Sequence, residues 1–425
     1  MVRSLRVTGM RVAKSILLYI LIATLVLLMG GLTGWYLYLH SKTSSTQAVD
    51  IARGLYAPPP TFSGNLGSTA ANTSDAGVPT GGITQPNTPI QRLWQVDHGP
   101  VAGMAFDLPA KPTASSTDLY FVERANGYVF VGNAQTQKTM RLTNTLMPKI
   151  YEALFAPAQK GVILRSLDTN GAITTFAGSF ASTTVATSSA PLALSGRYLP
   201  TNISHIIVDP KSGALFYLTP TAAAYGVTGT SVSWNGTKSK QVFSSTLANW
   251  QPQYVGTQIA LIESPADDLP GYAYALKSGG ALSLLFGPVP GLEILPNPQG
   301  DAFLYSASSL GTLSLYAQVG KKAPALLPIK TIAEKCVWAP GKSLMVYCAV
   351  PGNVASAHFL SDWFQGAVHT ADTWWQIDTS EGTAQVFYTM SRALDVQDPQ
   401  IDPTGNYIAF INGSDQSLWM LRIAP

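Results

Sequence analysis

From residue 91 onward the chain alternates short apolar runs, rich in β-branched and aromatic residues, with clusters of Gly, Pro, Asn and Asp. No stretch of this region has the periodicity of a convincing amphipathic helix, so the pattern predicts an all-β structure. One unit recurs: an apolar strand, a turn with Pro or Gly, a second strand of aliphatic and aromatic residues, and two more strands. Its clearest copy runs from Ile401 to Phe410 and continues into Leu418–Leu421.

Three further stretches repeat the strand–turn–strand part of this unit, at residues 208–217, 297–305 and 339–347. All of these copies have a proline followed by a glycine in the turn. They resemble the repeats of TolB-like proteins, a branch of the WD-type propellers, whose units carry a Pro-Asp-Gly-like turn, an Ile-Ala-Phe-like strand and a Leu-Trp-like strand. The resemblance implies a β-propeller, and because this fold hosts many unrelated activities, it implies no particular function.

The number of repeats follows from where the first strand of each unit begins. These starts fall near residues 101, 150, 203, 251, 292, 334 and 398. The intervals are those of four-stranded blades of roughly 40–45 residues with loop insertions. We therefore predict a seven-bladed β-propeller of four-stranded antiparallel blades. The last unit contains only three strands, so we expect residues 92–96 to supply the fourth, which closes the ring and removes an exposed sheet edge.

The first 90 residues have a different character. Residues 15–39 contain no charged side chain and are long enough to span a bilayer, whereas the apolar region of a cleaved signal peptide is shorter. Four Arg and Lys residues precede this run, which orients the N-terminus toward the cytoplasm. Residues 57–90 carry Asp75 as their single charge and indicate a flexible stalk. The predicted divisions are a cytoplasmic N-terminus at 1–14, a transmembrane helix at 15–39, an extracytoplasmic stalk at 40–90 and a propeller at 91–425.

Composition excludes several classes of protein. Charged residues make up 12% of the 425 residues and hydrophobic residues 46%, which does not fit a charge-rich disordered chain. The net charge of +3 comes from the first fourteen residues, so the remainder offers no basic surface to nucleic acid. Two cysteines exclude a disulfide-dense scaffold and a four-thiolate zinc site. Motifs for nucleophilic, phosphate-binding or zinc-dependent catalysis are absent from the sequence, which does not favour an enzyme.

Ionisable residues recur at one position of the first strands. In five units this strand ends at a turn proline, and an ionisable residue stands five positions before each of these prolines. A buried unpaired charge is costly, and the innermost strands of a propeller surround a central channel. We therefore predict a polar ring around the axis made of Glu152, His205, Glu293, Lys335 and Asp398.

The other two units have Gly103 and Gln251 or Gln253 near the same place. The apolar neighbours of the ring, which we expect to pack between blades, are Ala153, Ile206, Ile294 and Cys336. Two alternatives remain for the ring. It lines a hydrated channel without a ligand, or Glu152, Glu293 and Asp398 hold a small polar ligand or a cation, with calcium or magnesium favoured by oxygen ligands. Apart from such a cation, no cofactor is predicted.

The sixth unit carries the longest insertion, at about residues 351–371. Long loops on a rigid scaffold often bind partners, and aromatic side chains dominate such contacts. The candidate binding residues of this insertion and the strand that follows it are His358, Asp362, Trp363, Phe364 and Trp374. The alternative is that these aromatic side chains pack on their own scaffold. The spacing of the histidines and the aspartate matches no recurring metal site.

Cys336 and Cys348 lie on the first two strands of the same unit. A hairpin centred on Lys342 places them directly opposite each other, on the same face of the sheet. The alternatives are a disulfide, which requires the closer type of cross-strand pair, and two buried free thiols. The extracytoplasmic location that the apolar segment implies permits oxidation.

Together these features predict a single-pass, membrane-anchored, extracytoplasmic propeller that acts as a scaffold for other proteins of a cell envelope or cell surface. The alternative function is binding of a carbohydrate or another small ligand at the axial mouth of the propeller, with or without catalysis. The two differ in where exposed aromatic side chains and carboxylates lie. An outer loop favours the scaffold, and the axis favours the ligand site.

Overall fold

The computed structural model describes residues 91–107, 117–180, 191–222, 226–354 and 356–424, together with Met29. The predicted transmembrane helix and stalk lie outside these residues, apart from Met29. Within the described residues no helix combines the length and the apolar character that a membrane span requires. The sheets described below all belong to the second of the two units into which the chain divides, Gln85–Pro425.

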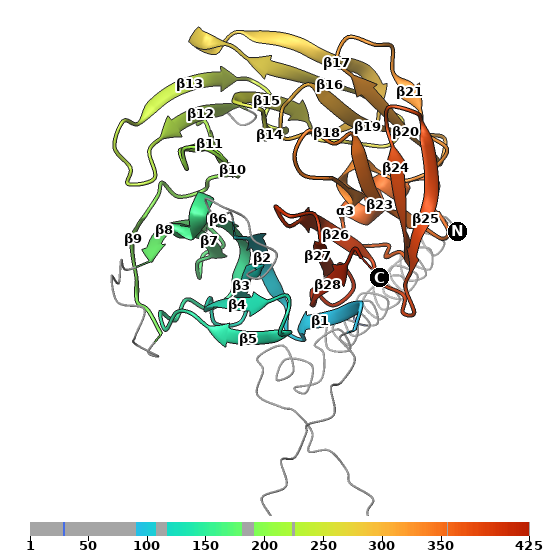
Figure 1. The fold of residues 1–425 in the computed structure, drawn as a ribbon. Helices are drawn as coiled ribbons and strands as arrows, with labels where there is room; N and C mark the ends of the chain where they lie inside the picture. Colours follow the sequence, from blue (N-terminus) through green and yellow to red (C-terminus); the bar gives the residue numbers. More distant parts are fainter. Residues whose placement is uncertain are drawn as a thin grey trace, which may run out of the picture. The chain divides into compact units, whose positions relative to one another are not determined.

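Within these residues the chain forms seven antiparallel sheets of four strands, arranged around a common centre (Figure 1). Blades 1 to 3 each use four consecutive strands. Blade 1 contains β2 (Val101–Phe106), β3 (Asp118–Glu123), β4 (Val129–Asn133) and β5 (Lys138–Arg141). Blade 2 contains β6 (Ile150–Phe155), β7 (Gly161–Leu167), β8 (Ile173–Phe180) and β9 (Leu194–Tyr198). Blade 3 contains β10 (His205–Val208), β11 (Leu215–Pro220), β12 (Val227–Val232) and β13 (Lys240–Ser245).

Blades 4 to 6 follow the same order. Blade 4 contains β14 (Trp250–Val255), β15 (Gln258–Glu263), β16 (Pro270–Leu276) and β17 (Leu282–Pro290). Blade 5 contains β18 (Glu293–Pro296), β19 (Ala302–Ser309), β20 (Thr312–Val319) and β21 (Ala325–Leu326). Blade 6 contains β22 (Cys336–Trp338), β23 (Met345–Pro351), β24 (Asp372–Asp378) and β25 (Thr383–Thr389).

Blade 7 joins the two ends of the propeller. It combines β26 (Val396–Ile401), β27 (Tyr407–Asn412) and β28 (Leu418–Arg422) with β1 (Leu93–Asp97), which forms its outermost strand. β1 and β28 are antiparallel, with Leu93 opposite Leu421. The predicted seven-bladed ring, closed by a strand from the N-terminal side, is confirmed.

Four short helical segments interrupt the strands within the described residues. Three are single 3-10 turns, η1 (Pro157–Gln159), η2 (Ser278–Gly280) and η3 (Ala333–Lys335). The fourth is the α-helix α3 (Phe359–Phe364), which lies in the insertion of blade 6. The sequence pattern predicts no helix there, because six residues are too few to show a helical period.

The repeated Asp-Pro and Asn-Pro turns are explained by hydrogen bonds to the backbone. The Asp402 side chain accepts hydrogen bonds from the backbone N–H groups of Thr404, Asn406 and Tyr407 at 2.7–3.0 Å. Such a side chain satisfies the turn that links the first and second strands. Gly405 in this turn has a φ of 75°, which side-chain-bearing residues rarely adopt. The residues of the repeat signature are therefore those that the turn needs, and the signature indicates the fold and no particular function.

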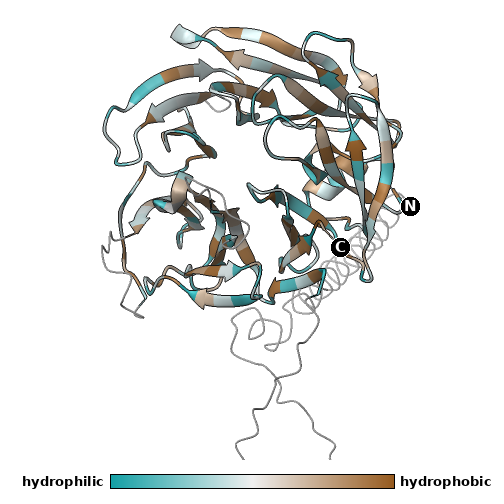
Figure 2. Cartoon of the chain, in the orientation of Figure 1, coloured by the Kyte–Doolittle hydropathy of each residue, from teal (hydrophilic) through white to brown (hydrophobic). Residues whose placement is uncertain are grey.

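Seven apolar clusters hold the blades together, one at each junction between neighbouring blades. Brown and teal segments alternate along the strands in Figure 2, as expected when each sheet buries apolar side chains against its neighbours. The four residues expected between blades, Ala153, Ile206, Ile294 and Cys336, all belong to these clusters. Because successive side chains of a strand point to opposite faces, the polar residues next to these four in sequence point away from the same clusters.

Candidate functional site

Four of the five residues predicted around the axis lie on the innermost strands of their blades, Glu152 on β6, His205 on β10, Glu293 on β18 and Asp398 on β26. Glu152, His205 and Asp398 line one cavity of about 880 Å³. Gln251 of β14 lines it as well. In Figure 1 the strands β6, β10, β14 and β26 stand around the centre of the ring. The structure therefore brings three of the five predicted residues together at the axis.

Lys335 does not belong to this ring, and the prediction is wrong for this residue. Its side chain is fully buried, and Nζ donates hydrogen bonds to Asp372 Oδ2 at 2.8 Å and to Asp395 Oδ1 at 2.6 Å. The 3-10 turn η3 immediately before β22 changes the direction of successive side chains. As a result the neighbouring residue, Glu334, lines the axial cavity in place of Lys335.

Glu293 lies close to Glu334 but is not one of the residues that line the cavity. Its side chain is 7% exposed. One carboxylate oxygen accepts a hydrogen bond from Ser306 Oγ at 3.3 Å, and Oε1 has no hydrogen-bond partner among the described residues. Burial raises the pKa of Glu293 to about 8, and the negative charge of Glu334 adds to the shift. This carboxyl group is therefore mostly protonated at neutral pH.

The two carboxylates at the wall of the cavity are also perturbed. Burial raises the pKa of Asp398 to about 7, with the charges of Glu334 and Glu152 acting in the same direction. Burial also raises the pKa of Glu334, against the attraction of Lys335. Both side chains are nevertheless accessible to solvent. The two carboxylates therefore lie at the surface of the cavity, partly enclosed by protein and still open to solvent.

A bulge in β26 presents Asp398. The register between β26 and β27 shifts between Gln397 and Gln400, and Asp398 has a φ of 46°. Bulges of this kind redirect a side chain and are frequent beside functional sites. The left-handed φ of an aspartate is uncommon and costs free energy, which the surrounding sheet must offset.

Arg165 is a charged residue of the cavity that the sequence analysis missed. It comes from β7, is 3% exposed, and donates a hydrogen bond to the Glu152 carboxylate. It also donates to the backbone carbonyls of Ile203 at 2.5 Å and Ser204 at 3.1 Å. Its Nε atom has no partner among the described residues. Glu152 is thus neutralised by a fixed cation.

His205 faces the same part of the cavity. Burial lowers its pKa, and the positive charge of Arg165 lowers it further. Its Nδ1 atom has no hydrogen-bond partner within the part of the chain that the structure describes. This histidine is therefore an uncharged polar group of the cavity wall at neutral pH.

The insertion of blade 6 does not present its tryptophans to a partner, and this part of the prediction is wrong. Trp363 is 4% exposed and Trp374 is fully buried, in contact with the Phe410 ring. They are buried because α3 packs its apolar side on blade 5 and because β24 lies inside blade 6. His358 is exposed just before α3, and Asp362 accepts a hydrogen bond from Ser356 Oγ at 2.5 Å.

Phe364 at the end of α3 has a different position. It is 43% exposed and lines the axial cavity together with the carboxylates. An aromatic residue predicted on an outer binding loop and the ring predicted around the axis therefore meet in one cavity. Tyr151 of β6 is a second aromatic residue of the cavity wall.

Two aspartates from other parts of the ring hold α3 in place. Asp267, from the β15–β16 connection, accepts hydrogen bonds from the backbone N–H of Ser361 at 2.8 Å and of Leu360 at 3.4 Å. It thereby caps the start of a helix whose own N-cap residue makes no side-chain cap. Asp395 accepts a hydrogen bond from Trp363 Nε1 at 2.9 Å. The position of Phe364 is thus fixed from both sides.

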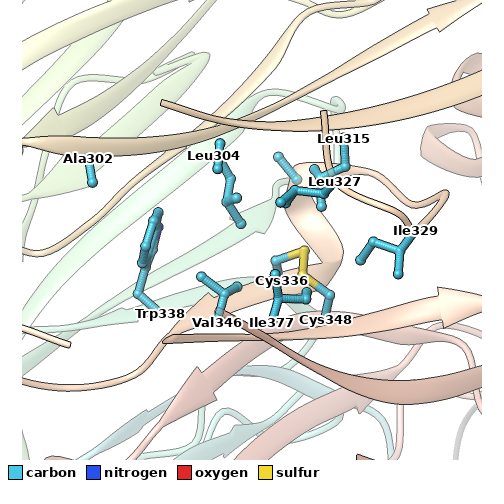
Figure 3. Packing of buried hydrophobic residues seen from close by; sticks show 12 residues of the cluster. Ala302, Leu304, Leu315, Leu327, Ile329, Cys336, Trp338, Val346, Cys348 and Ile377 are labelled. Carbon is cyan, nitrogen blue, oxygen red and sulfur yellow. A yellow bond between two sulfur atoms is a disulfide. The ribbon is translucent and has the colours of Figure 1, made fainter. Parts of the chain in front are cut away.

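The two cysteines form a disulfide in the structure, between the first two strands of blade 6. Cys336 stands directly opposite Cys348, with their Cα atoms 4.0 Å apart. Both are buried in the apolar cluster between blades 5 and 6, which is shown in Figure 3. Of the two alternatives from the sequence, the structure contains the bridge.

The wall of the cavity combines polar and aromatic side chains. In the described part of the chain no three His, Cys, Asp or Glu side chains are grouped so as to hold one metal ion. Glu152, one of the three residues considered for a cation, is engaged by Arg165. A cation held jointly by Glu152, Glu293 and Asp398 is therefore not supported.

No protein-family model and no curated protein sequence matches this chain. Among solved structures it is similar to oligogalacturonate lyase from Vibrio parahaemolyticus, at 10% identity and a TM-score of 0.48, over 76% of this chain and 98% of that one. It is also similar to virginiamycin B lyase from Staphylococcus aureus, at 11% identity and a TM-score of 0.48, over 78% and 98% of the two chains. Similarity this low transfers no activity, and the TolB-like resemblance of the repeats stays a prediction.

One sequence signal could have revealed Arg165. It stands in the run Gly161–Leu167, where it is the single charged residue among buried aliphatic neighbours. Glu334 could have been predicted as a cavity residue only if the alignment of the first strands had allowed a shift of one position in blade 6. Asp267 had no such signal, because the helix residues that it caps lie more than ninety positions away.

Proposed function

We propose that this protein binds a small polar ligand in the axial cavity of its propeller. The observation that carries the proposal is the lining of the cavity, in which Glu152, His205, Glu334 and Asp398 from four blades meet Phe364 from α3. Its volume of about 880 Å³ is that of typical small-molecule sites. Exposed carboxylates and an exposed aromatic ring at the axis favour this function over a scaffold on the outer loop.

A thermal-shift screen of chemically diverse small molecules on the full chain in detergent tests this proposal. Gln251→Trp fills the cavity, and Gln385→Trp places the same side chain on the exposed outer strand β25. We expect compounds that raise the melting temperature of the wild type and of Gln385→Trp but not of Gln251→Trp. The proposal fails if no compound stabilises the protein, or if every stabilising compound acts equally on Gln251→Trp.

We also propose that residues 15–39 anchor the protein in a membrane with the propeller outside the cytoplasm. The uncharged length of this segment and the positive charges before it support the proposal. The disulfide supports an oxidising compartment. Alkaline extraction of membranes and protease treatment of intact cells test it. Release of the protein at high pH, or a propeller protected from external protease, would contradict it.

A scaffold role in an envelope or surface assembly is a second candidate, favoured by one feature of the outer rim. The outermost strand of blade 4, β17, exposes Leu282 and Leu284, and Leu284 is 56% exposed. A sheet edge with exposed apolar side chains is a common place for a partner to add a strand. Co-purification with wild type and with Leu284→Lys distinguishes this role, since an identical set of partners would remove β17 from consideration.

A further inference from the structure

Two carboxyl groups of the axial cavity have no cationic partner in it. Besides Tyr151, the ionisable residues that line the cavity are Glu152, Arg165, His205, Glu334 and Asp398. Arg165 pairs with Glu152, and the lowered pKa of His205 keeps the imidazole uncharged near pH 7. The carboxyl groups of Glu334 and Asp398 remain, and no cation among the described cavity residues is left to pair with them. Their pKa values are raised, and a cation bound beside them would favour their ionised forms.

The nearest candidate for such a cation is turned away. Lys335 follows Glu334 directly, yet its ammonium group is enclosed by Asp372, Asp395, Thr370 and the backbone carbonyl of Val396. Its attraction for Glu334 does not outweigh the cost of burying that carboxylate. The ammonium group of Lys335 is therefore buried in its own cluster and does not line the cavity, although Lys335 is adjacent to Glu334 in sequence.

The two free carboxylates are also poorly satisfied by hydrogen bonds. Asp398 accepts one, from Gln400 Nε2 at 3.3 Å, and within the described residues Glu334 receives none on its carboxylate. Behind Glu334, the buried Glu293 has an oxygen without a partner. The carboxylates of Glu334 and Asp398 are open to solvent, so an entering cation with N–H groups can donate charge-assisted hydrogen bonds to them directly.

The apolar part of the cavity faces the same ligand. Phe364 presents 43% of its surface, and Tyr151 of β6 lies beside Arg165 in the same cavity. Aromatic faces attract organic cations and cover their carbon skeletons. The volume of about 880 Å³ is also far larger than one metal ion needs, and it suits a molecule of many atoms.

Building on the proposed function, we infer that the ligand of the axial cavity is an organic cation, an amine or a guanidinium compound, whose charged group is held by Glu334 and Asp398 and whose apolar part lies against Phe364. Glu152 and Arg165 form the neutral opposite wall.

Three probes of the same size and different charge test this inference: benzylamine, benzyl alcohol and benzoate, titrated calorimetrically into the full chain in detergent at neutral pH. We expect benzylamine to bind at least tenfold more tightly than the other two. Glu334→Gln should weaken benzylamine binding at least tenfold, whereas Glu381→Gln, on the exposed turn between β24 and β25, should leave it unchanged. Asp398→Asn provides a second variant if Glu334→Gln lowers the amount of folded protein.

The outcomes separate this inference from the proposed function. Equal binding of all three probes, or binding of benzylamine that Glu334→Gln does not change, would overturn the organic cation while leaving a ligand site. Failure of all three probes would also overturn it, and the diverse screen would still decide whether the cavity binds anything. Stabilisation by calcium chloride alone, abolished in Glu334→Gln, would show a metal site in its place.

Discussion

Replacing Lys335 by methionine tests the buried ion cluster that joins blades 6 and 7. The substitution keeps most of the apolar stem and removes the ammonium group, which donates hydrogen bonds to two aspartates, a threonine and a backbone carbonyl. Lys335, Asp372 and Asp395 all have fully buried side chains. Methionine therefore leaves two buried carboxylates without their cation.

The expected loss of stability is about 3–5 kcal/mol, the range found when one partner of a buried ion pair is removed. The Trp363 ring also loses a cation that lies 4.8 Å from its centroid. Asp372 and Asp395 differ in the hydrogen bonds that they keep after Lys335 is replaced. Asp395 keeps hydrogen bonds from Trp363 and Thr370, whereas Asp372 keeps mainly the backbone N–H of Val396. Asp372→Asn should therefore partly restore the stability of Lys335→Met.

The assay is equilibrium unfolding of the full chain in detergent by urea, followed by tryptophan fluorescence. Burial raises the pKa of Asp372, so protonation favours the folded state. Loss of Lys335 strengthens this effect, and the deficit of Lys335→Met should shrink as the pH is lowered. A loss below about 1 kcal/mol, within the range of exposed ion pairs, would refute the reasoning. So would a double variant less stable than the sum of the two single ones predicts.

Three further predictions follow from the contacts around the cavity. Asp267→Ala removes the side-chain cap of α3 and should cost about 1 kcal/mol. Hydrogen exchange at Leu360 and Ser361 should be faster than in a Ser212→Ala control at an exposed turn, and unchanged exchange would exclude the cap. Replacing both Cys336 and Cys348 by alanine should cost about 3 kcal/mol by the loop-entropy model, measured by urea unfolding, and free thiols in unreduced wild type would contradict the bridge. The pKa values of Asp398, about 7, and Glu293, about 8, lie above those of unfolded carboxyl groups, so their stabilising effect is complete at acidic pH and is lost as the pH rises toward 8. The melting temperature should fall over this interval, and it should fall less in Asp398→Asn; an equal fall would assign the effect to other groups.

The architecture could be derived from the sequence because several blades repeat the same local solution. An apolar strand, a turn with Pro and Gly, and a second apolar strand recur in four units, and the expected starts agree with Val101, Ile150 and Trp250 to within a residue. The hydrogen bonds that Asp402 accepts from the backbone N–H groups of Asn406 and Tyr407 show why this signal can be read from the sequence, since donor and acceptor are neighbours in the chain. Interactions between residues that are close in sequence can therefore be recognised from the sequence alone.

The candidate site could be derived only in part, because its remaining features depend on distant contacts. The exchange of Lys335 for Glu334 at the axis results from one 3-10 turn, which the strand alignment did not include. The helix that carries Phe364 is capped by Asp267, from another blade. Trp363 looked like a binding residue because nothing in its own segment indicated that Asp395 and Ile332 would enclose it.

The pairing of β1 with β28 has a consequence for how the chain reaches its folded state. The Arg92 side chain donates hydrogen bonds to the backbone carbonyl of Arg422, 330 positions later, so the contacts that complete blade 7 are among the most non-local in the protein. During synthesis β1, which contains the apolar Trp94, has no strand to pair with until Leu418–Arg422 has left the ribosome. Blades 1 to 6 are made of consecutive strands and are able to form in order, but the ring stays open until the last strand arrives. A chain that terminates before Leu418 would therefore keep two unpaired edges, and these edges would direct it toward aggregation or degradation.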